Sequence, residues 1–390
     1  MNEGKMQRVY RTVMLIMIVA TITYVITTML VYDKEKKYTI STNDNMDMIE
    51  KIESSVGTVK KILDEKYIGD INENDLVEGA VKGMVEGIGD VYTEYFTKEE
   101  YESFTASTIG NFVGIGVYMQ ANLENGLVEI VEPIENSPAE RAGLKSGDKI
   151  LKVNGVEYTA AELDKLASAV KGEEGTEVEL TILRDEEEME FSIVRESIHV
   201  NYVSEEMLDD EIGYISLESF DDDCCNDFLK AYNELIEDGM KYLVLDLRNN
   251  GGGLVDEALE IADLFCDKGN TTLITVDKNG EQEITKAKKN PTITIPVVLI
   301  VNQYSASATE LLAAALKDNG KAEIVGTQTY GKGVIQELIP LSNGGAIKVT
   351  TSEYYTPNGE KINKIGVEPD YEIENVDEQL MKAQEILKNK

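Results

Sequence analysis

Residues 295–320 read IPVVLIVNQYSASATELLAAALKDNG and predict a strand, a short loop and a helix in that order. Residues 296–302 are apolar almost throughout, whereas a strand with one solvated face would alternate apolar and polar residues. The helical stretch ATELLAAALKD follows directly after Ser307. A strand without alternation that leads into a helix is typical of a sheet covered by helices on both faces.

A second unit of the same kind precedes it. Residues 241–265 read KYLVLDLRNNGGGLVDEALEIADLF, again a continuous apolar strand, a loop and a helix. Three consecutive glycines cost folding entropy, so they suggest that the backbone must approach something closely, although a flexible turn is the alternative. Two such units predict an α/β core in the second half of the chain.

Composition excludes some functions. The chain has 390 residues, with 73 acidic against 37 basic side chains and a formal net charge of −36. A surface that negative repels nucleic acid, so no nucleic-acid partner is expected. The cysteines are odd in number and two are adjacent, which predicts buried or inert thiols rather than a disulfide framework. The single histidine, His199, is expected at the surface, and no metal ion or other cofactor is expected.

The amino-terminal segment predicts a membrane anchor. Residues 12–32, TVMLIMIVATITYVITTMLVY, carry no charge and would span roughly 30 Å as a helix, which is the thickness of a bilayer core. No small-x-small cleavage site follows, so we expect an uncleaved anchor after a tail of residues 1–11. Three basic residues lie close to each end of the segment, so the positive-inside rule leaves the orientation open.

Residues 33–105 predict a small helical region. Apolar residues recur at steps of three and four over residues 49–63, as in an amphipathic helix. A second helix is expected from about Asn74. Its expected buried side consists of Leu76, Val77, Ala80, Val81, Met84, Val85 and Ile88.

Residues 106–195 change to short strands and glycine turns. Strands are predicted within 111–119, 126–134, 148–155 and 177–185, and a helix within 159–172. The stretch NSPAERAGLKSGDKILKVNG predicts a short helix over residues 138–142 that Gly143 ends, followed by a turn and an apolar strand. This order resembles a PDZ domain, which binds an extended peptide end as an added strand. The alternative is a generic small β-domain.

The segment FVGIGV is similar to the carboxylate-binding loop of PDZ domains. There, backbone N–H groups point at the terminal carboxylate of the peptide, and glycines permit its close approach. The residues expected to bind the peptide carboxylate are Val113, Gly114, Ile115 and Gly116.

Ser307 stands where the strand of the first unit passes into its helix, with Glu310 three residues later. Ser-x-x-Glu is a capping box, and helix capping alone explains both residues. The functional alternative is a nucleophile at a helix N-terminus, where unpaired N–H groups and the helix dipole favour negative charge. A tetrahedral oxyanion would gain from the N–H of Ala308, and Gly252 and Gly253 of the glycine loop would supply a second donor.

A serine nucleophile needs a base, and Lys332 is the candidate. Its stretch, GTQTYGKGVIQ, has the spacing of a phosphate-binding loop, but Gly333 stands where such a loop needs Ser or Thr. The residues that follow read as extended chain instead of the required helix. Burial lowers a lysine pKa from about 10.4 towards about 7–8, which suits a general base. The neutral amide of Gln336 can orient the amine, provided that the chain bends near Gly333.

With these residues the chain resembles a carboxy-terminal processing protease, also called a tail-specific protease. The family has a Ser–Lys–Gln catalytic set, carried here by NQYSASATELLAAALKDNG and VGTQTYGKGVIQ, and a later motif, TTSEYYTPNGEKINKIGVEPD. The serine-to-lysine interval of 332 − 307 = 25 positions and the lysine-to-glutamine interval of 336 − 332 = 4 match the family and favour Ser307 over Ser305. The usual Asn-Pro-Gly-Gly has Gly251 in place of proline, which implies a floppier oxyanion loop.

The resemblance implies an α+β multidomain protein with a transmembrane helix, a helical region, a PDZ β-domain and a crotonase-like α/β serine-protease core. The core is expected over residues 196–372 and a last helix over 373–390. The resemblance places the amino terminus in the cytoplasm and the catalytic part outside it. It also implies dimerisation, for which residues 49–63 and the last helix are the candidates.

These inferences give a membrane-anchored serine endopeptidase that binds protein C-termini through its PDZ domain and cleaves near them through an acyl-enzyme. Two rivals stay open, namely a peptide-binding adaptor with an inactive core and a protease that a partner switches on. A nucleotide hydrolase built on GTQTYGKG is the third alternative.

Overall fold

The computed structural model describes residues 46–109, 111–123 and 125–390. Within those ranges no helix is both long and apolar enough to cross a membrane. The predicted anchor, residues 12–32, lies outside the described residues. The chain divides into two compact units, one formed by residues up to Glu102 together with Gln336–Thr350, and the other by Ser103–Ile335 together with Thr351–Lys390.

The first unit contains the predicted helical region. Its elements are α2 (Met46–Lys66), α3 (Glu73–Glu86), β1 (Glu94–Phe96), most of β17 (Val334–Pro340) and the first part of β18 (Ala346–Tyr355). Strand β1 pairs with β18 in antiparallel register, from Glu94 opposite Lys348 to Phe96 opposite Ala346. Helix α4 (Lys98–Ile109) leads out of this unit into the next.

The prediction that one side of α3 is buried was wrong for most of its residues. Val85 is buried, but Val77, Met84 and Ile88 are 61%, 56% and 63% exposed. The helix has the predicted periodicity, but nothing in the described chain covers most of that stripe. On α2, Val56 and Val59 are exposed in the same way.

The PDZ-like part follows in the second unit. Its sheet has the order β3-β4-β5-β7-β8, with β6 beside β5, and a two-stranded sheet pairs β2 with β9. The bounds are β2 (Asn111–Gly114), β3 (Val117–Asn122), β4 (Leu127–Pro133), α5 (Pro138–Ala142), β5 (Lys149–Val153), β6 (Val156–Glu157), a 3₁₀ turn (Ala160–Glu162), α6 (Leu163–Val170), β7 (Glu177–Arg184), β8 (Glu187–Val194) and β9 (Glu196–His199).

The predicted short helix of this part is confirmed as α5. The Ser137 side chain caps its N-terminus by accepting from Glu140 N, and Gly143 ends it at φ 88°, a left-handed conformation that favours glycine. The predicted strands are also present, and their apolar residues form one core with Ile130, Ile150 and Leu180 at its centre.

The α/β core has a six-stranded sheet with the order β10-β11-β12-β15-β16-β19. From β11 onward each neighbouring pair is parallel. The elements are β10 (Val203–Met207), β11 (Ile212–Leu217), α7 (Cys224–Glu237), β12 (Tyr242–Asp246), α8 (Val255–Phe265), β13 (Thr271–Asp277), β14 (Gln282–Lys286), β15 (Val297–Val301), α9 (Ala308–Asp318), β16 (Ala322–Gly326), β19 (Tyr371–Glu372) and α10 (Val376–Lys388).

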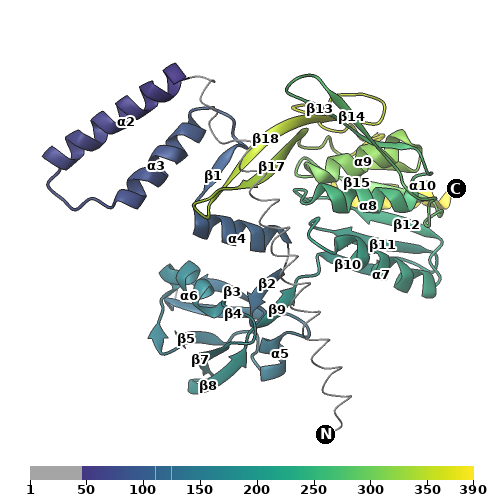
Figure 1. Cartoon of the computed structure of the whole chain (residues 1–390). Coiled ribbons are helices and arrows are strands. Elements are labelled where there is room, and N and C mark those ends of the chain that lie inside the picture. Colours follow the sequence, from purple (N-terminus) through teal and green to yellow (C-terminus); the bar gives the residue numbers. More distant parts are fainter. Residues whose placement is uncertain (1–45, 110, 124) are drawn as a thin grey trace, which may run out of the picture. The chain divides into compact units, whose positions relative to one another are not determined.

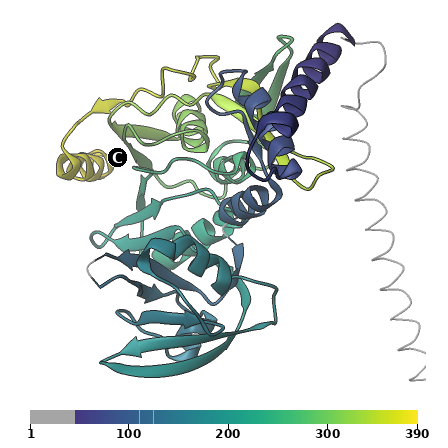
Figure 2. The same cartoon turned by 90° about the vertical axis from the view of Figure 1, so that its left-hand side faces the viewer.

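Helices cover both faces of this sheet, as the continuous apolar strands predicted (Figures 1 and 2). On one face, Leu243, Leu245 and Leu299 pack against α7, α8 and α9. On the other face, Val244 and Val298 pack against α10. Successive side chains of a strand point to opposite faces, so a strand buried on both sides must be apolar at every position.

Candidate active site

Ser307 stands at the junction of β15 and α9, as predicted, in a backbone conformation that is rare for serine. Its φ is 60° and its ψ is −119°, outside the regions that side chains with a Cβ favour. Such strain persists only where the surroundings hold it, and it clusters at functional sites. The side chain is half-buried, and Ala308 next to it is the first residue of α9.

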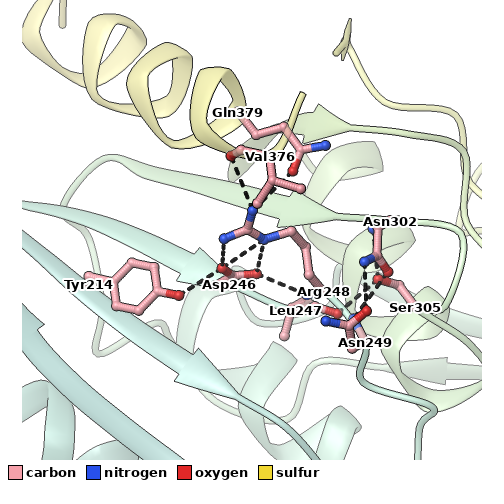
Figure 3. Close-up of polar contacts among 9 residues, drawn as sticks. All are labelled: Tyr214, Asp246, Leu247, Arg248, Asn249, Asn302, Ser305, Val376 and Gln379. Carbon is pink, nitrogen blue, oxygen red and sulfur yellow. Dashed lines mark hydrogen bonds and ion pairs between the residues drawn. The ribbon is translucent and has the colours of Figure 1, made fainter. Parts of the chain in front are cut away.

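Ser305, two residues earlier, has a structural position. Its side chain is fully buried, its hydroxyl donates to Leu247 O at 2.8 Å, and it accepts from Asn302 N at 3.0 Å. Asn302 in turn donates from Nδ2 to Asn249 Oδ1 at 2.9 Å (Figure 3). These contacts tie the loop after β12 to the loop after β15, and they use both hydrogen-bonding functions of the Ser305 hydroxyl.

The glycine loop lies close to Ser307, so the prediction of a close approach is confirmed for two of the three glycines. A Cβ on Gly252 would lie 2.8 Å from both Ala306 O and Ser307 Cβ. A Cβ on Gly253 would lie 2.2 Å from Phe220 O, and both glycines have positive φ. A Cβ on Gly251 would meet nothing within 4 Å.

Asn250 holds this loop in place, which sequence reasoning missed. The residue is fully buried, donates from Nδ2 to Leu217 O at 2.9 Å, and accepts from Gly252 N at 2.8 Å. Its carbonyl accepts from Ala306 N and from the Thr309 hydroxyl. These contacts come from the asparagine that the usual motif also has, so the expectation that Gly251 in place of proline makes the loop floppier stays a prediction. The N–H of Gly252 is already engaged, which leaves Gly253 as the glycine donor to consider.

Lys332 lies half-buried in the loop between β16 and β17, and glycines on both sides let this loop pack tightly, as predicted. A Cβ on Gly333 would lie 2.2 Å from Asn363 N, and one on Gly331 would lie 2.9 Å from Ile365 N. Strand β17 begins at Val334, where a phosphate-binding loop would continue into a helix. The nucleotide-hydrolase alternative fails on this geometry.

The loop of Lys332 is joined to Ser307 by Glu310. The carboxylate of Glu310 accepts from Ser307 N at 2.9 Å, which is the capping contact, and also from Lys332 N at 2.9 Å. The side chain is fully buried, and burial raises the pKa of Glu310 above its usual value. The motif Ser-x-x-Glu was the only sequence signal for this residue, and it predicted the first contact alone.

Gln336 belongs to the other unit of the chain. It lies on β17, and its Nε2 donates to Thr350 Oγ1 at 3.5 Å. The Thr350 hydroxyl donates to Asp90 Oδ2 at 2.6 Å. Burial alone would raise the pKa of Asp90, but this hydrogen bond and those from Thr93 and Tyr92 hold that pKa below its usual value.

The proposed carboxylate-binding loop of the PDZ-like part spans the end of β2 and the turn into β3. Val113 and Gly114 end the strand, and the side chain of Ile115 is fully buried in the core. Gly116 has φ 78°, and a Cβ there would lie 2.3 Å from Ser137 Cβ. The turn needs a glycine at that position, and the carbonyl of Ile115 accepts from Ala139 N at 2.8 Å.

Comparison with known proteins decides the family. A probable CtpA-like serine protease of Staphylococcus haemolyticus is 36% identical over 369 residues, which are 94% of this chain and 73% of the relative. The chain belongs to the C-terminal processing protease family. The profile of peptidase family S41 matches residues 211–373, that of a PDZ domain matches 129–184, and that of the activating protease CtpB N-terminal domain matches 16–100.

Further proteins are similar to parts of this chain. A probable CtpA-like serine protease of Staphylococcus aureus is 38% identical over 82% of this chain, which spans 64% of that relative's length. A solved structure of the photosystem II D1 C-terminal processing protease is 28% identical, covers 82% of this chain and 86% of its own length, and has a TM-score of 0.49. A lipoprotein from Streptococcus agalactiae, 16% identical with coverage of 87% and 88%, shares the fold with a TM-score of 0.50.

A buried ion pair supports the loop after β12. Arg248 Nε contacts both oxygens of Asp246 at 2.9 and 3.0 Å, and its Nη1 donates to Gln379 Oε1 of α10 (Figure 3). The Tyr214 hydroxyl donates to Asp246 at 2.7 Å, and burial beside that carboxylate raises the pKa of Tyr214 to about 12. The network borders a cavity of about 760 Å³, which neither Ser307 nor Lys332 lines.

The third strand-to-helix junction, between β11 and α7, holds an unusual acid. Asp221 is 2% exposed, and neither carboxylate oxygen has a hydrogen-bond partner among the described residues. Burial raises the pKa of Asp221 to about 6. His199 was expected at the surface, but it is half-buried and its Nε2 lies 2.6 Å from Asp227 Oδ2. About a third of the imidazole stays exposed (34%), and β9 places it beside an acid on α7.

The cysteines are buried, as predicted. Burial raises the pKa of the Cys225 thiol to about 12 and that of Cys266 to about 11. It raises the pKa of Cys224 as well. Across the described ranges, no cluster of three or more His, Cys, Asp or Glu side chains could hold a metal ion.

Proposed function

We propose that this chain is a serine endopeptidase that binds the C-termini of proteins through its PDZ domain and cleaves near them. Ser307 is the nucleophile, Lys332 the general base, and Gln336 orients the lysine amine. The observation that carries the proposal is the hydrogen-bonded junction at Glu310, which joins the backbone of Ser307 to that of Lys332 although they are 332 − 307 = 25 residues apart.

In the proposed mechanism, the neutral amine of Lys332 takes the proton of Ser307 Oγ as that oxygen attacks the scissile carbonyl. The carbonyl oxygen becomes an oxyanion, which the N–H groups of Gly253 and Ala308 stabilise. Lys332 then gives the proton to the leaving amine, and an acyl-enzyme on Ser307 remains. Water, deprotonated by the same amine, hydrolyses the ester and restores the serine.

Three features support the oxyanion site. The Ala308 N–H stands at the N-terminus of an 11-residue helix, where the dipole favours negative charge. Gly252 lies so close to Ser307 that an added Cβ would be 2.8 Å from Ser307 Cβ. Gly253 lies next to it, and its backbone is exposed. We therefore assign the glycine donor to Gly253, with Gly252 setting the close approach.

Substrate selection is proposed to begin at the PDZ domain. The loop of Val113, Gly114, Ile115 and Gly116, at the end of β2, is the proposed site for a terminal carboxylate. A bound C-terminus would add a strand to the domain. A short peptide ending in apolar residues should therefore activate cleavage of a second substrate, whereas its amidated form should activate far less.

The remaining proposals concern location and assembly. The uncharged residues 12–32 support a single membrane anchor, with the amino terminus in the cytoplasm and the catalytic part outside. Exposed apolar side chains on α2 and α3, such as Val59 and Met84, support a homodimer through these helices. Helix α10 is a poorer candidate, since Ala383 and Leu387 already pack against the chain's own sheet.

One rival from another class is a peptide-binding adaptor with an inactive core. The strained Ser307 and its connection to Lys332 favour a working enzyme, because an adaptor needs neither. The discriminating experiment compares the wild type with Ser307→Ala on an unfolded reporter that ends in apolar residues. Cleavage by the wild type alone supports the peptidase, and equal binding without cleavage by both proteins supports the adaptor. Cleavage that appears only with a cellular extract indicates a partner-gated enzyme.

A further inference from the structure

We propose that Glu310 and Tyr354 are positioning residues that hold the nucleophile and the base at a fixed separation. The inference rests on the proposed function, since it assumes that Ser307 and Lys332 react together. It assigns to the two side chains a role beyond helix capping and core packing. Each contacts the backbone of both Ser307 and Lys332.

The carboxylate of Glu310 accepts hydrogen bonds from the backbone N–H groups of both residues. A single oxygen, Oε2, accepts from Ser307 N and from Lys332 N, both at 2.9 Å. The other oxygen accepts from Gly331 N at 2.7 Å and from the Thr329 hydroxyl at 2.5 Å. These four contacts fill the roughly four acceptor positions of a carboxylate. Helix capping would need only the first of them, and the other three donors come from the loop of Lys332.

The hydroxyl of Tyr354 contacts the backbone carbonyl groups of both residues. Its hydroxyl oxygen lies 2.8 Å from Ser307 O and 2.6 Å from Lys332 O. The tyrosine is 2% exposed and comes from β18, so its ring is fixed by packing. Its own N–H donates to Gly333 O at 3.0 Å, which attaches the strand to the same loop. One phenol oxygen therefore contacts the carbonyls of both reacting residues.

Glu310 and Tyr354 together link the backbones of Ser307 and Lys332 through both their N–H and their C=O groups. Neither Ser307 nor Lys332 lies within a helix or strand, so no regular ladder fixes the distance between them. Ser307 also has a strained backbone conformation, which would relax without supporting contacts. Misplacement by about 1 Å can cost a catalytic pair about 100-fold in rate. Short contacts to the buried side chains of Glu310 and Tyr354 can prevent such a displacement of Ser307 relative to Lys332.

The test uses two conservative variants of the full chain, each with a matched control. Glu310→Gln keeps the size of the side chain but turns one oxygen into a donor, which then faces N–H groups. Its control is Glu257→Gln, a half-buried carboxylate, which accepts from Cys225 N at 2.7 Å at the start of α7. Tyr354→Phe keeps the ring, and its control is Tyr355→Phe, whose hydroxyl donates to Glu353.

Three readouts separate positioning from a general loss of structure. We expect Glu310→Gln to lower kcat about 100-fold and Tyr354→Phe about 10-fold, with KM changed less than about twofold in both. The rate at which a fluorophosphonate labels Ser307 should fall in the same proportion. The double variant should lose less than the product of the single losses, because both side chains hold the same pair. The two control variants should keep wild-type kcat.

The proposal is overturned if both variants, shown to be folded by their thermal unfolding, keep wild-type kcat and labelling. It is also overturned if activity falls only as far as the folded fraction falls. Should Glu310→Gln not fold, the result for Tyr354→Phe decides alone. Ser307→Ala run in parallel separates the two levels. A cleaving Ser307→Ala protein would sink the proposed function, whereas an inactive one beside fully active Glu310→Gln and Tyr354→Phe would sink only this inference.

Discussion

The junctions after β12 and β15 have the same plan, but different residues give their loops their shape. In both, a buried parallel strand ends in a loop that enters a helix, and in both one non-glycine residue has positive φ, Asn249 at 62° and Ser307 at 60°. The first loop gains its shape from glycines and from its own Asn250. The second has no glycine and is held by Glu310 and by Tyr354, which comes from another part of the chain. Both loops therefore depend on partners from elsewhere in the chain, but only the first shows its close approach in the local sequence, as three consecutive glycines.

The largest expected effect separates the two serines of the second junction. Ser307→Ala should lower the rate of reporter cleavage by at least about 10⁴-fold, because it removes the nucleophile, while the unfolding temperature stays near that of the wild type. Ser305→Ala should do the reverse. It leaves a buried carbonyl and a buried N–H without their partner and should cost about 1–3 kcal/mol of unfolding free energy. A dead Ser305→Ala protein beside an active Ser307→Ala protein would exchange the two assignments.

A smaller effect is expected from the glycines of the first junction. Gly252→Ala should lower kcat about 100-fold, because the new Cβ would lie 2.8 Å from Ser307 Cβ and displace either the loop or the nucleophile. Gly251→Ala is the matched control, since a Cβ there meets nothing within 4 Å. Steady-state kinetics on a small ester substrate would measure both. Similar kcat values for the two variants would mean that the close approach has no catalytic consequence.

The smallest effect concerns the third junction, after β11, where Asp221 is buried without a hydrogen-bond partner among the described residues. Its folded pKa of about 6 lies above the ordinary value of 3.8, so its contribution to stability is fully present below pH 3.8 and is lost as the pH rises through 6. Asp221→Asn stays neutral and avoids that loss. Urea unfolding should show the variant more stable by about 1–2 kcal/mol at pH 8 and unchanged near pH 4. An equal difference at both pH values would contradict the titration.

The sequence predicts whatever depends on neighbours along the chain. Helix α5 and its end at Gly143, the apolar strands of the core and the close approach of the glycine loop are all local patterns. The contacts of Glu310 with the loop of Lys332 join segments about 20 residues apart. The Ser-x-x-Glu motif predicts only the capping contact with Ser307. Tyr354 lies in a strand where any large apolar residue would fit the pattern. The prediction that the apolar stripe of α3 is buried failed for the converse reason. Periodicity shows that a helix has an apolar face, but it does not show what covers that face.

Active-site labelling at several pH values tests the central claim most directly. The wild type, Lys332→Arg and Ser307→Ala would be treated with a fluorophosphonate, and the modified residue identified by peptide mass spectrometry. The account predicts one adduct, on Ser307, formed at a rate that rises with pH through an apparent pKa well below that of free lysine. It predicts no adduct with Lys332→Arg, because a guanidinium does not give up its proton in proteins. Undiminished labelling of Lys332→Arg, or an adduct on Ser305, would contradict it.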